Sequence, residues 1–228
     1  MALVATIGFI GGTGPEGKGL AYRFALAGHE IVIGSRNRDR AEAAAQETAG
    51  HAPGAQARGA ENAEAARAGE VVLITVPFSA QADTLPPLRE ALDGNIVVSA
   101  AVPMSFDPST SLRAGSGKPA MLTVAEGSAA EQAQALLPGA KVVGAFQNLS
   151  ASKLWAGDSS LGQDVIVCGD NADAKRRVMA LADQIRGARA VDGGPLAASR
   201  YVEGITVLLI GINRRHKATT GVRIVGLP

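Results

Sequence analysis

Residues 6–36 read TIGFIGGTGPEGKGLAYRFALAGHEIVIGSR, and this stretch decides the fold. An apolar run at Thr6–Ile10 predicts a strand, and a glycine-rich turn follows it directly. The helical pattern of Gly17–Ala27 and the apolar run Glu30–Ser35 predict a helix and a second strand. A strand, a tight turn, a helix and a strand in this order form a βαβ unit, in which the two strands lie parallel in one sheet.

The same alternation continues along the first 150 residues. Within these residues, further strands are predicted at Val71–Val76, Asn95–Ser99 and Lys141–Ala145, and further helices at Arg38–Ala49 and Ala60–Ala68. Beyond residue 150, we predict a strand at Asp164–Cys168 and helices at Ala172–Arg186 and Leu196–Arg215. Strands rich in Val and Ile are typical of parallel sheets covered on both faces. We therefore predict an α/β protein with a Rossmann-type parallel sheet and helices on both faces. Residues 1–150 would form the nucleotide-binding domain, and residues 151–228 a smaller C-terminal domain that closes the substrate cleft and ends in a helix.

Two segments rich in loop-forming residues interrupt this alternation. They are residues 101–118 and 150–162, and the second contains the predicted domain boundary.

The composition argues against several classes of protein. The 228 residues carry a formal net charge of +1, which provides no overall positive field for a nucleic acid. The longest dense apolar stretch, Ile205–Ile212, is shorter than the roughly 20 residues that span a bilayer. Cys168 is the only cysteine, so we expect it to be buried and expect neither an intrachain disulfide nor a metal site. The first residues lack the basic region of a secretory signal, and we therefore expect a cytoplasmic protein.

Residues Gly12-Thr13-Gly14-Pro15-Glu16-Gly17 satisfy the dinucleotide-binding pattern G-x-G-x-x-G. Gly12 permits the tight turn, Gly14 allows the backbone to approach a pyrophosphate, and Gly17 allows close packing of helix and strand. The free N–H groups at the start of the helix would face the anion. A phosphate-binding P-loop is disfavoured, because Gly19 stands where that motif needs a hydroxyl for Mg²⁺.

The end of the second predicted strand indicates which dinucleotide is bound. NAD-binding proteins place Asp or Glu there to accept hydrogen bonds from the ribose, whereas this chain has Ser35-Arg36. The Arg36 guanidinium offers a planar fork to a 2′-phosphate, and Arg38 and Arg40 follow closely. The sequence therefore favours NADP over NAD, with Arg38 equally consistent with a solvated helix face.

The sequence provides no obvious catalytic acid or base. Neither Tyr22 nor Tyr201 is followed by Lys four residues later, and the histidines fall in predicted turns or near the end of the chain. A proton donor is less important when hydride passes directly between two rings, because stacking, distance and exclusion of water then control the reaction. The loops expected to hold such rings follow the strands, at Val76–Phe78, Ala101–Met104 and Gln147–Ala151.

The chain resembles the F420-dependent NADP oxidoreductases in several ordered stretches. The matching residues are Ile10–Leu20, His29–Arg36, Val102-Pro103, Asp164–Asp170 and Gly194–Glu203. The resemblance implies hydride exchange between NADPH and the 5-deazaflavin coenzyme F420, across a cleft between two domains, in a homo-oligomer that we expect to be a dimer. It also implies small-molecule redox coenzymes as the partners, and neither a nucleic acid nor a membrane.

The resemblance further implies roles for individual residues. Thr13–Glu16 would hold the pyrophosphate, Ser35, Arg36 and Arg40 the 2′-phosphate, and Val76, Val102 and Ala151 the nicotinamide side. Gln147 stands where some relatives carry His. The phosphate and glutamate tail of F420 implies a local basic patch, for which the candidates are Lys153, Arg200, Arg214, Arg215 and Lys217. Arg214–Lys217 is equally consistent with a basic helix end.

Two other functions remain open from the sequence. One is an NADP-dependent reductase of a small carbonyl or imine, which would need a proton donor in a long C-terminal helical domain. The other is a non-catalytic NADP sensor that changes its affinity for a partner with the redox state.

Overall fold

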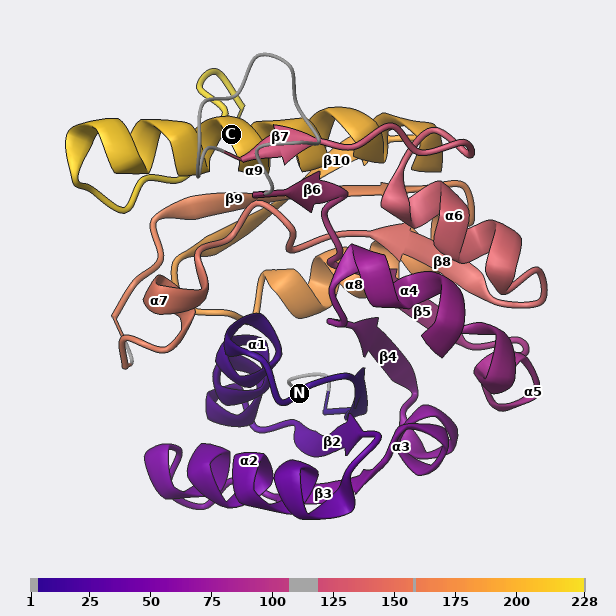
Figure 1. Cartoon of the computed structure of the whole chain (residues 1–228). Coiled ribbons are helices and arrows are strands. Elements are labelled where there is room, and N and C mark those ends of the chain that lie inside the picture. The colour runs from indigo at the N-terminus through magenta and orange to yellow at the C-terminus, as the bar shows by residue number, and fades with distance from the viewer. Residues whose placement is uncertain (1–3, 107–118, 158, 228) are drawn as a thin grey trace.

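The computed structural model describes residues 4–106, 119–157 and 159–227. Most of the loop-rich segment predicted at residues 101–118 lies outside the described residues, as do the first three residues of the chain and residue 158 in the second such segment. The described chain forms an eight-stranded sheet covered by helices, with α9 running along one edge of the molecule (Figure 1).

The sheet has the strand order β10-β9-β8-β5-β4-β1-β2-β3. Its strands are β1 Thr6–Ile10, β2 Glu30–Ser35, β3 Ala57–Glu61, β4 Val71–Ile74, β5 Ile96–Ser99, β8 Lys141–Gly144, β9 Gln163–Gly169 and β10 Ala188–Gly194. A separate two-stranded sheet pairs β6 Met104–Ser105 with β7 Ala120–Met121. The helices are α1 Pro15–Leu26, α2 Arg38–His51, α3 Asn62–Ala68, α4 Phe78–Thr84, α5 Arg89–Leu92, α6 Ala129–Leu136, α7 Ala151–Leu154, α8 Ala172–Ala182 and α9 Ser199–His216. Short 3₁₀ turns occur at Pro86–Leu88 and Leu196–Ala198.

Every neighbouring pair in the large sheet is parallel except β8 and β9. The chain leaves β8 at the carboxyl edge, forms α7 and enters β9 with Gly144 opposite Cys168, so β9 and β10 run against the other strands. The predicted α/β class with a mostly parallel sheet is confirmed. The division at residue 150 stays a prediction, and strands from both sides of it belong to one sheet.

Both faces of the sheet are buried under helices, as the sequence predicts. One core combines β-strand side chains such as Phe9 and Leu73 with Phe24 of α1, Ala44 of α2 and Val178 of α8. The opposite core combines side chains of β4 and β8 with those of α3, α5 and α6. The near-continuous apolar content of the central strands follows from this double coverage.

Several element boundaries differ from the sequence-based expectation. The helix expected from Ala60 begins at Asn62, because Ala60 and Glu61 pair with Gly34 and Ser35 as the end of β3. That strand reads ARGAE, which has little strand propensity by itself, and pairing with β2 recruits it to the edge of the sheet. The strand β10 and the helix α6 were also not predicted, and α8 ends at Ala182 instead of Arg186.

An ion pair anchors the C-terminal segment to the sheet. The buried Asp164 of β9 accepts two hydrogen bonds from Arg189 of β10, at 2.9 Å from Nε and 2.7 Å from Nη2. The Ile224 N–H also donates to Asp164 Oδ2 at 2.6 Å, and Arg189 returns a bond to the Ile224 carbonyl at 2.7 Å. The hydrogen bond from Arg189 holds the pKa of Asp164 below its usual value. The tail that follows α9 is thereby fixed against β9.

The last helix differs from the rest in its exposure. Among the described residues, one helical segment, Leu196–His216, is long and apolar enough to span a membrane by length and composition alone, and 22% of its apolar 18-residue window is buried. Its buried Glu203 instead ties it to the domain, because the carboxylate accepts hydrogen bonds from the Ala129 and Ala130 N–H groups at the start of α6. Burial raises the pKa of Glu203 to about 7.

Candidate functional site

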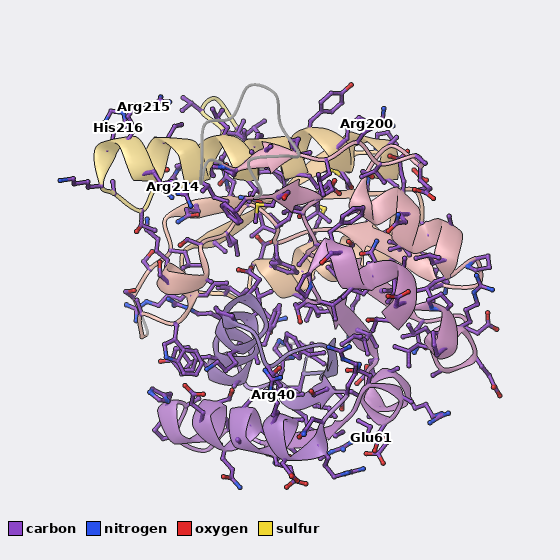
Figure 2. The ribbon with its side chains drawn as sticks, viewed as in Figure 1. Arg40, Glu61, Arg200, Arg214, Arg215 and His216 are labelled. Carbon is purple, nitrogen blue, oxygen red and sulfur yellow. The ribbon has the colours of Figure 1, made fainter. Side chains whose placement is uncertain are left out.

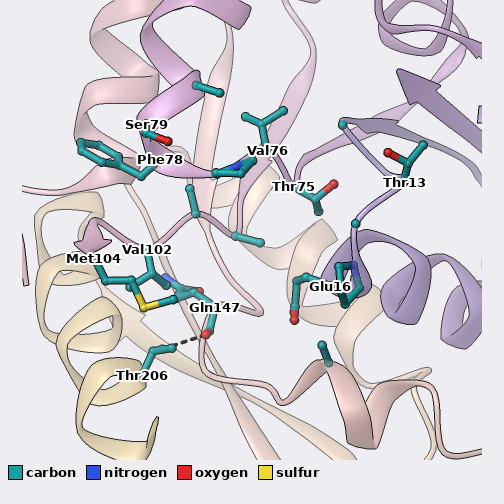
Figure 3. Close-up of a pocket in the computed structure, with 18 of the residues that line it drawn as sticks. Thr13, Glu16, Thr75, Val76, Phe78, Ser79, Val102, Met104, Gln147 and Thr206 are labelled. Carbon is teal, nitrogen blue, oxygen red and sulfur yellow. Dashed lines mark hydrogen bonds between the residues drawn. The ribbon is translucent and has the colours of Figure 1, made fainter. Parts of the chain in front are cut away.

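A cavity of about 930 Å³ opens at the carboxyl edge of the parallel strands. It is bounded by the turn between β1 and α1, the ends of β2, β4 and β5, the loop between β8 and α7, and one face of α9. Ligands of open α/β sheets bind at this edge. Figure 3 shows part of this cavity, with side chains that come from segments as far apart as Thr13 and Thr206.

The glycine-rich turn has the geometry that the sequence predicts. Gly12 donates its N–H to the Gly34 carbonyl at 3.0 Å, and a Cβ on Gly17 would lie 2.7 Å from Gly12 Cα. These two glycines therefore allow close packing within the turn, and they do not line the cavity. Thr13, Gly14, Pro15 and Glu16 do line it, and a Cβ on Gly14 would meet open space.

The start of α1 is free to bind an anion. Gly14 is the N-cap residue and supplies no side-chain hydrogen bond to the first turn. The N–H groups of that turn therefore receive no hydrogen bond from an N-cap side chain, and the turn lies beside the cavity, which is the arrangement that binds phosphates in related turns.

Two features of the turn were missed in the sequence. Gly11 has φ +74°, and a Cβ there would overlap the Cγ1 atom of Val76. Asn62, the first residue of α3, accepts a hydrogen bond from the Gly11 N–H at 3.2 Å and lines the cavity. The second glycine of a GG pair was the available signal for Gly11, whereas Asn62 is 51 residues away and gave none.

The structure brings Ser35, Arg36 and Arg40 together at one corner of the cavity. Asn37 organises this corner, because its side chain accepts a hydrogen bond from the Arg40 N–H at 3.0 Å and its own N–H donates to Ser35 Oγ at 3.2 Å. Arg38 instead pairs with Glu64 at 2.6 Å and does not line the cavity. The corner is therefore positively charged, and Arg38 belongs to the solvated helix face.

The opposite half of the cavity is largely apolar. Val76, Val102 and Ala151 line it, with Phe78 and Met104 beside them (Figure 3). The C-terminal segment was predicted to close the cleft, but the lining residues that α9 contributes were not predicted; they include Thr206, Leu209, Ile210 and Asn213. Helical periodicity identifies an apolar face but not the element that it meets.

Gln147 is a buried polar residue in this half of the cavity. Its side chain is 3% exposed, and neither Nε2 nor Oε1 has a hydrogen-bond partner among the described residues. Its backbone carbonyl accepts a hydrogen bond from Thr206 Oγ1 at 2.7 Å, which fixes the loop against α9 (Figure 3). A buried primary amide with an unused donor and acceptor matches the polar edge of a ring that carries an amide or imide.

Glu16 is the one carboxylic acid among the described lining residues. Its side chain points along the cavity (Figure 3), and its Oε1 atom is buried without a hydrogen-bond partner among the described residues. Burial raises the pKa of Glu16 to about 8. The carboxyl is therefore mostly protonated at neutral pH.

The five candidates for a basic patch do not gather in one place. None lines the cavity, and Arg200 binds Glu131 at one end of α9, whereas Arg214 and Arg215 lie at the other end (Figure 2). The Arg214 guanidinium lies 5.2 Å from the centre of the Phe106 ring, and Phe106 lines the cavity. Of these cations, Arg214 is thus in direct contact with a lining residue.

Metal chemistry has no visible basis in the described part of the chain. No group of three or more His, Cys, Asp or Glu side chains that could hold an ion occurs there. Cys168 is buried in β9, and burial raises the pKa of its thiol to about 11.

Comparisons with known proteins agree with this geometry. The family model for "NADP oxidoreductase coenzyme F420-dependent" matches residues 6–103. The F420-dependent NADP reductase of Methanocaldococcus jannaschii is 41% identical over 226 residues, covering 97% of this chain and 98% of the relative. A crystal structure of a putative F420-dependent NADP reductase from Arthrobacter sp. FB24 superposes with a TM-score of 0.80 at 25% identity, covering 96% of this chain and 98% of that chain.

A more distant likeness concerns the fold alone. An imine reductase from Bacillus cereus has a TM-score of 0.58 at 17% identity, and the match covers 93% of this chain but 63% of that one. The reductase of Methanocaldococcus jannaschii is more similar in both respects, because its sequence identity is higher and the match covers nearly the whole length of both chains. Fold, glycine turn and sequence identity together show that this chain belongs to the family of F420-dependent NADP reductases.

Proposed function

We propose that the protein is an oxidoreductase that transfers hydride between NADP(H) and coenzyme F420. The observation that carries the proposal is the division of one cavity into two halves. One half has the uncapped start of α1, which suits a pyrophosphate, and the corner formed by Ser35, Arg36 and Arg40, which suits a 2′-phosphate. The other half is apolar and suits two stacked rings.

Each predicted residue has a role in this arrangement. Thr13, Gly14, Pro15 and Glu16 surround the pyrophosphate, while Gly12 and Gly17 keep the turn tight. Ser35, Arg36 and Arg40 hold the 2′-phosphate, and Val76, Val102 and Ala151 contact the nicotinamide. The nicotinamide and the deazaflavin supply the redox chemistry, and the chain aligns the two rings and excludes water.

The lining residues also argue against reduction of a carbonyl or an imine. Among the described residues, no His, Lys, Tyr or Asp lines the cavity, and Glu16 lies in the pyrophosphate turn. A reductase of such substrates needs a proton donor beside the ring. Direct transfer between rings does not, which favours F420 as the second substrate.

The expected result of mixing the purified protein with NADPH and F420 is loss of the visible absorbance of oxidised F420. The control is NADH in place of NADPH, which should give much slower turnover because it lacks the phosphate that the Arg36 corner holds. Turnover only with carbonyls or imines would support the first alternative. Tight NADPH binding without turnover of any acceptor would support a sensor.

We further propose that the protein is a cytoplasmic homodimer whose copies pack through α9. Leu208 is 62% exposed and Tyr201 71% exposed on this helix, and a Cβ on Gly204 or Gly211 would meet open space. An exposed apolar helix with small residues permits close approach of a second copy.

Light scattering after size exclusion should give twice the monomer mass, and Leu208→Lys should shift the protein toward the monomer. A monomeric wild type would contradict the dimer. Binding of the wild type to liposomes would instead assign the exposed face of α9 to a membrane.

A further inference from the structure

Glu16 presents an electrostatic problem for the proposed nucleotide site. The residue lies in the first turn of α1, next to the N–H groups proposed to hold the pyrophosphate. An ionised carboxylate there would repel the phosphates that those groups attract. The residue must therefore either be neutral when the dinucleotide is bound or weaken its binding.

The surroundings of Glu16 favour the neutral acid. Its Oε1 atom is inaccessible to solvent and has no partner among the described residues, although the side chain as a whole lies along the cavity wall. The start of a helix normally stabilises a carboxylate, but burial outweighs that effect and raises the pKa of Glu16 to about 8. An approaching pyrophosphate adds negative charge and raises the pKa further.

The other elements around the cavity place few charges there. Among the described lining residues, the other charged side chains are Arg36 and Arg40 at the 2′-phosphate corner. Lys18, two residues after Glu16 in α1, pairs with Glu47 of α2 at 2.8 Å. The ends of β4 and β5, the 147–151 loop and the described face of α9 contribute neutral side chains. The enclosed Oε1 atom has no partner in the described chain, which favours the neutral acid, and the other carboxyl oxygen is the one left to face a ligand in the cavity.

We propose that Glu16 binds the dinucleotide as a protonated acid, by donating a hydrogen bond from its carboxyl to a phosphate or ribose oxygen of NADP(H). Deprotonation then removes a donor and adds a repelling charge. NADP(H) binding therefore depends on the protonation of Glu16. The protonated form, which binds the dinucleotide, is present below the pKa of Glu16 and is lost as the pH rises through that pKa. This inference rests on the proposed function, since it concerns the same nucleotide.

The test is the affinity for NADPH between pH 7 and 9.5, measured by calorimetry. The second ionisation of a phosphate monoester, near pH 6, lies below this range. Because the pKa of Glu16 in the free protein is about 8, the wild-type Kd for NADPH is expected to rise about 30-fold between pH 7 and 9.5. In Glu16→Gln, whose amide cannot ionise, the Kd should be independent of pH. Glu90→Gln, which changes an exposed acid of α5 away from the cavity, should retain the wild-type pH dependence.

A second measurement covers the case in which Glu16→Gln does not fold. Calorimetry of the wild type at pH 8.5 in two buffers of different ionisation enthalpy should show uptake of roughly three quarters of a proton on binding. A flat wild-type profile without proton uptake, or a pH dependence that persists in Glu16→Gln, overturns this role of Glu16 and leaves the proposed function intact. Absence of NADPH binding at pH 7 overturns both.

Discussion

Replacing Arg36 by alanine is expected to weaken NADPH binding by about 1–3 kcal/mol, roughly 5- to 150-fold, and to leave NADH binding nearly unchanged. Arg36 lines the corner proposed for the 2′-phosphate together with Arg40 and Ser35. A planar guanidinium can form paired, charge-assisted hydrogen bonds with a phosphate, and alanine leaves no donor in their place. The change should therefore remove most of the preference for NADPH over NADH.

Arg38→Ala is the matched control for this prediction. Arg38 is two residues away and carries the same charge, but it pairs with Glu64 and does not line the cavity. Its removal should change the affinity for NADPH only slightly, through long-range and salt-screened effects. Equal losses in the two variants would mean that general charge attracts the nucleotide, and unchanged affinity in Arg36→Ala would exclude Arg36 from the phosphate site.

The second large effect is expected for Arg23→Met, which should lower the stability of the fold by about 2–4 kcal/mol. Arg23 is 2% exposed and donates to three carbonyls, those of Leu154 at 2.7 Å, Lys153 at 2.6 Å and Ser159 at 2.8 Å. Methionine fills similar volume but leaves these carbonyls without their donor. For a chain of this size the melting temperature should fall by roughly 4–16 °C.

The same substitution should also weaken NADPH binding. Arg23 attaches the segment around α7 to α1, and Ala151 at the start of α7 lines the half of the cavity that we propose for the nicotinamide. Thermal denaturation and NADPH titration of Arg23→Met, with Arg176→Met as control, test both effects. Arg176 is an exposed residue of α8 whose ion pair joins two neighbouring turns, so its loss should leave the melting temperature within about 1–2 °C. An unchanged melting temperature in Arg23→Met would show that water replaces the guanidinium at these carbonyls.

Much of the nucleotide half could be predicted from contiguous residues. The strand, the glycine turn and α1 occupy residues 6–26 without interruption, and Ser35 ends the strand that pairs with β1, directly before Arg36. Parallel pairing places the carboxyl ends of β1 and β2 at one edge, so the pyrophosphate turn and the arginine corner had to be neighbours. The spacing of neighbouring residues and the parallel pairing of β1 with β2 were sufficient to predict this half of the candidate site.

The remaining elements depended on long-range contacts. The strand ARGAE at 57–61 forms because β2 offers an open edge, and its own composition does not favour a strand. Arg23 looked like an ordinary helix residue, yet its partners are about 130 residues away. The C-terminal segment was predicted to close the cleft, but the face of α9 that lines the cavity was not, because an apolar periodicity does not identify its partner.

The sequence by itself thus determined the fold class, the glycine turn proposed for the pyrophosphate and the arginines proposed for the 2′-phosphate, because each is encoded in the type and spacing of neighbouring residues. The tertiary structure alone decided the burial of Glu16 and Gln147, the hydrogen bonds from Arg23 to distant carbonyls and the face of α9 that lines the cavity. Burial, and with it the pKa of an acid or the unmet hydrogen bonds of an amide, depends on which distant surfaces exclude water from a group, and residue spacing carries no record of that.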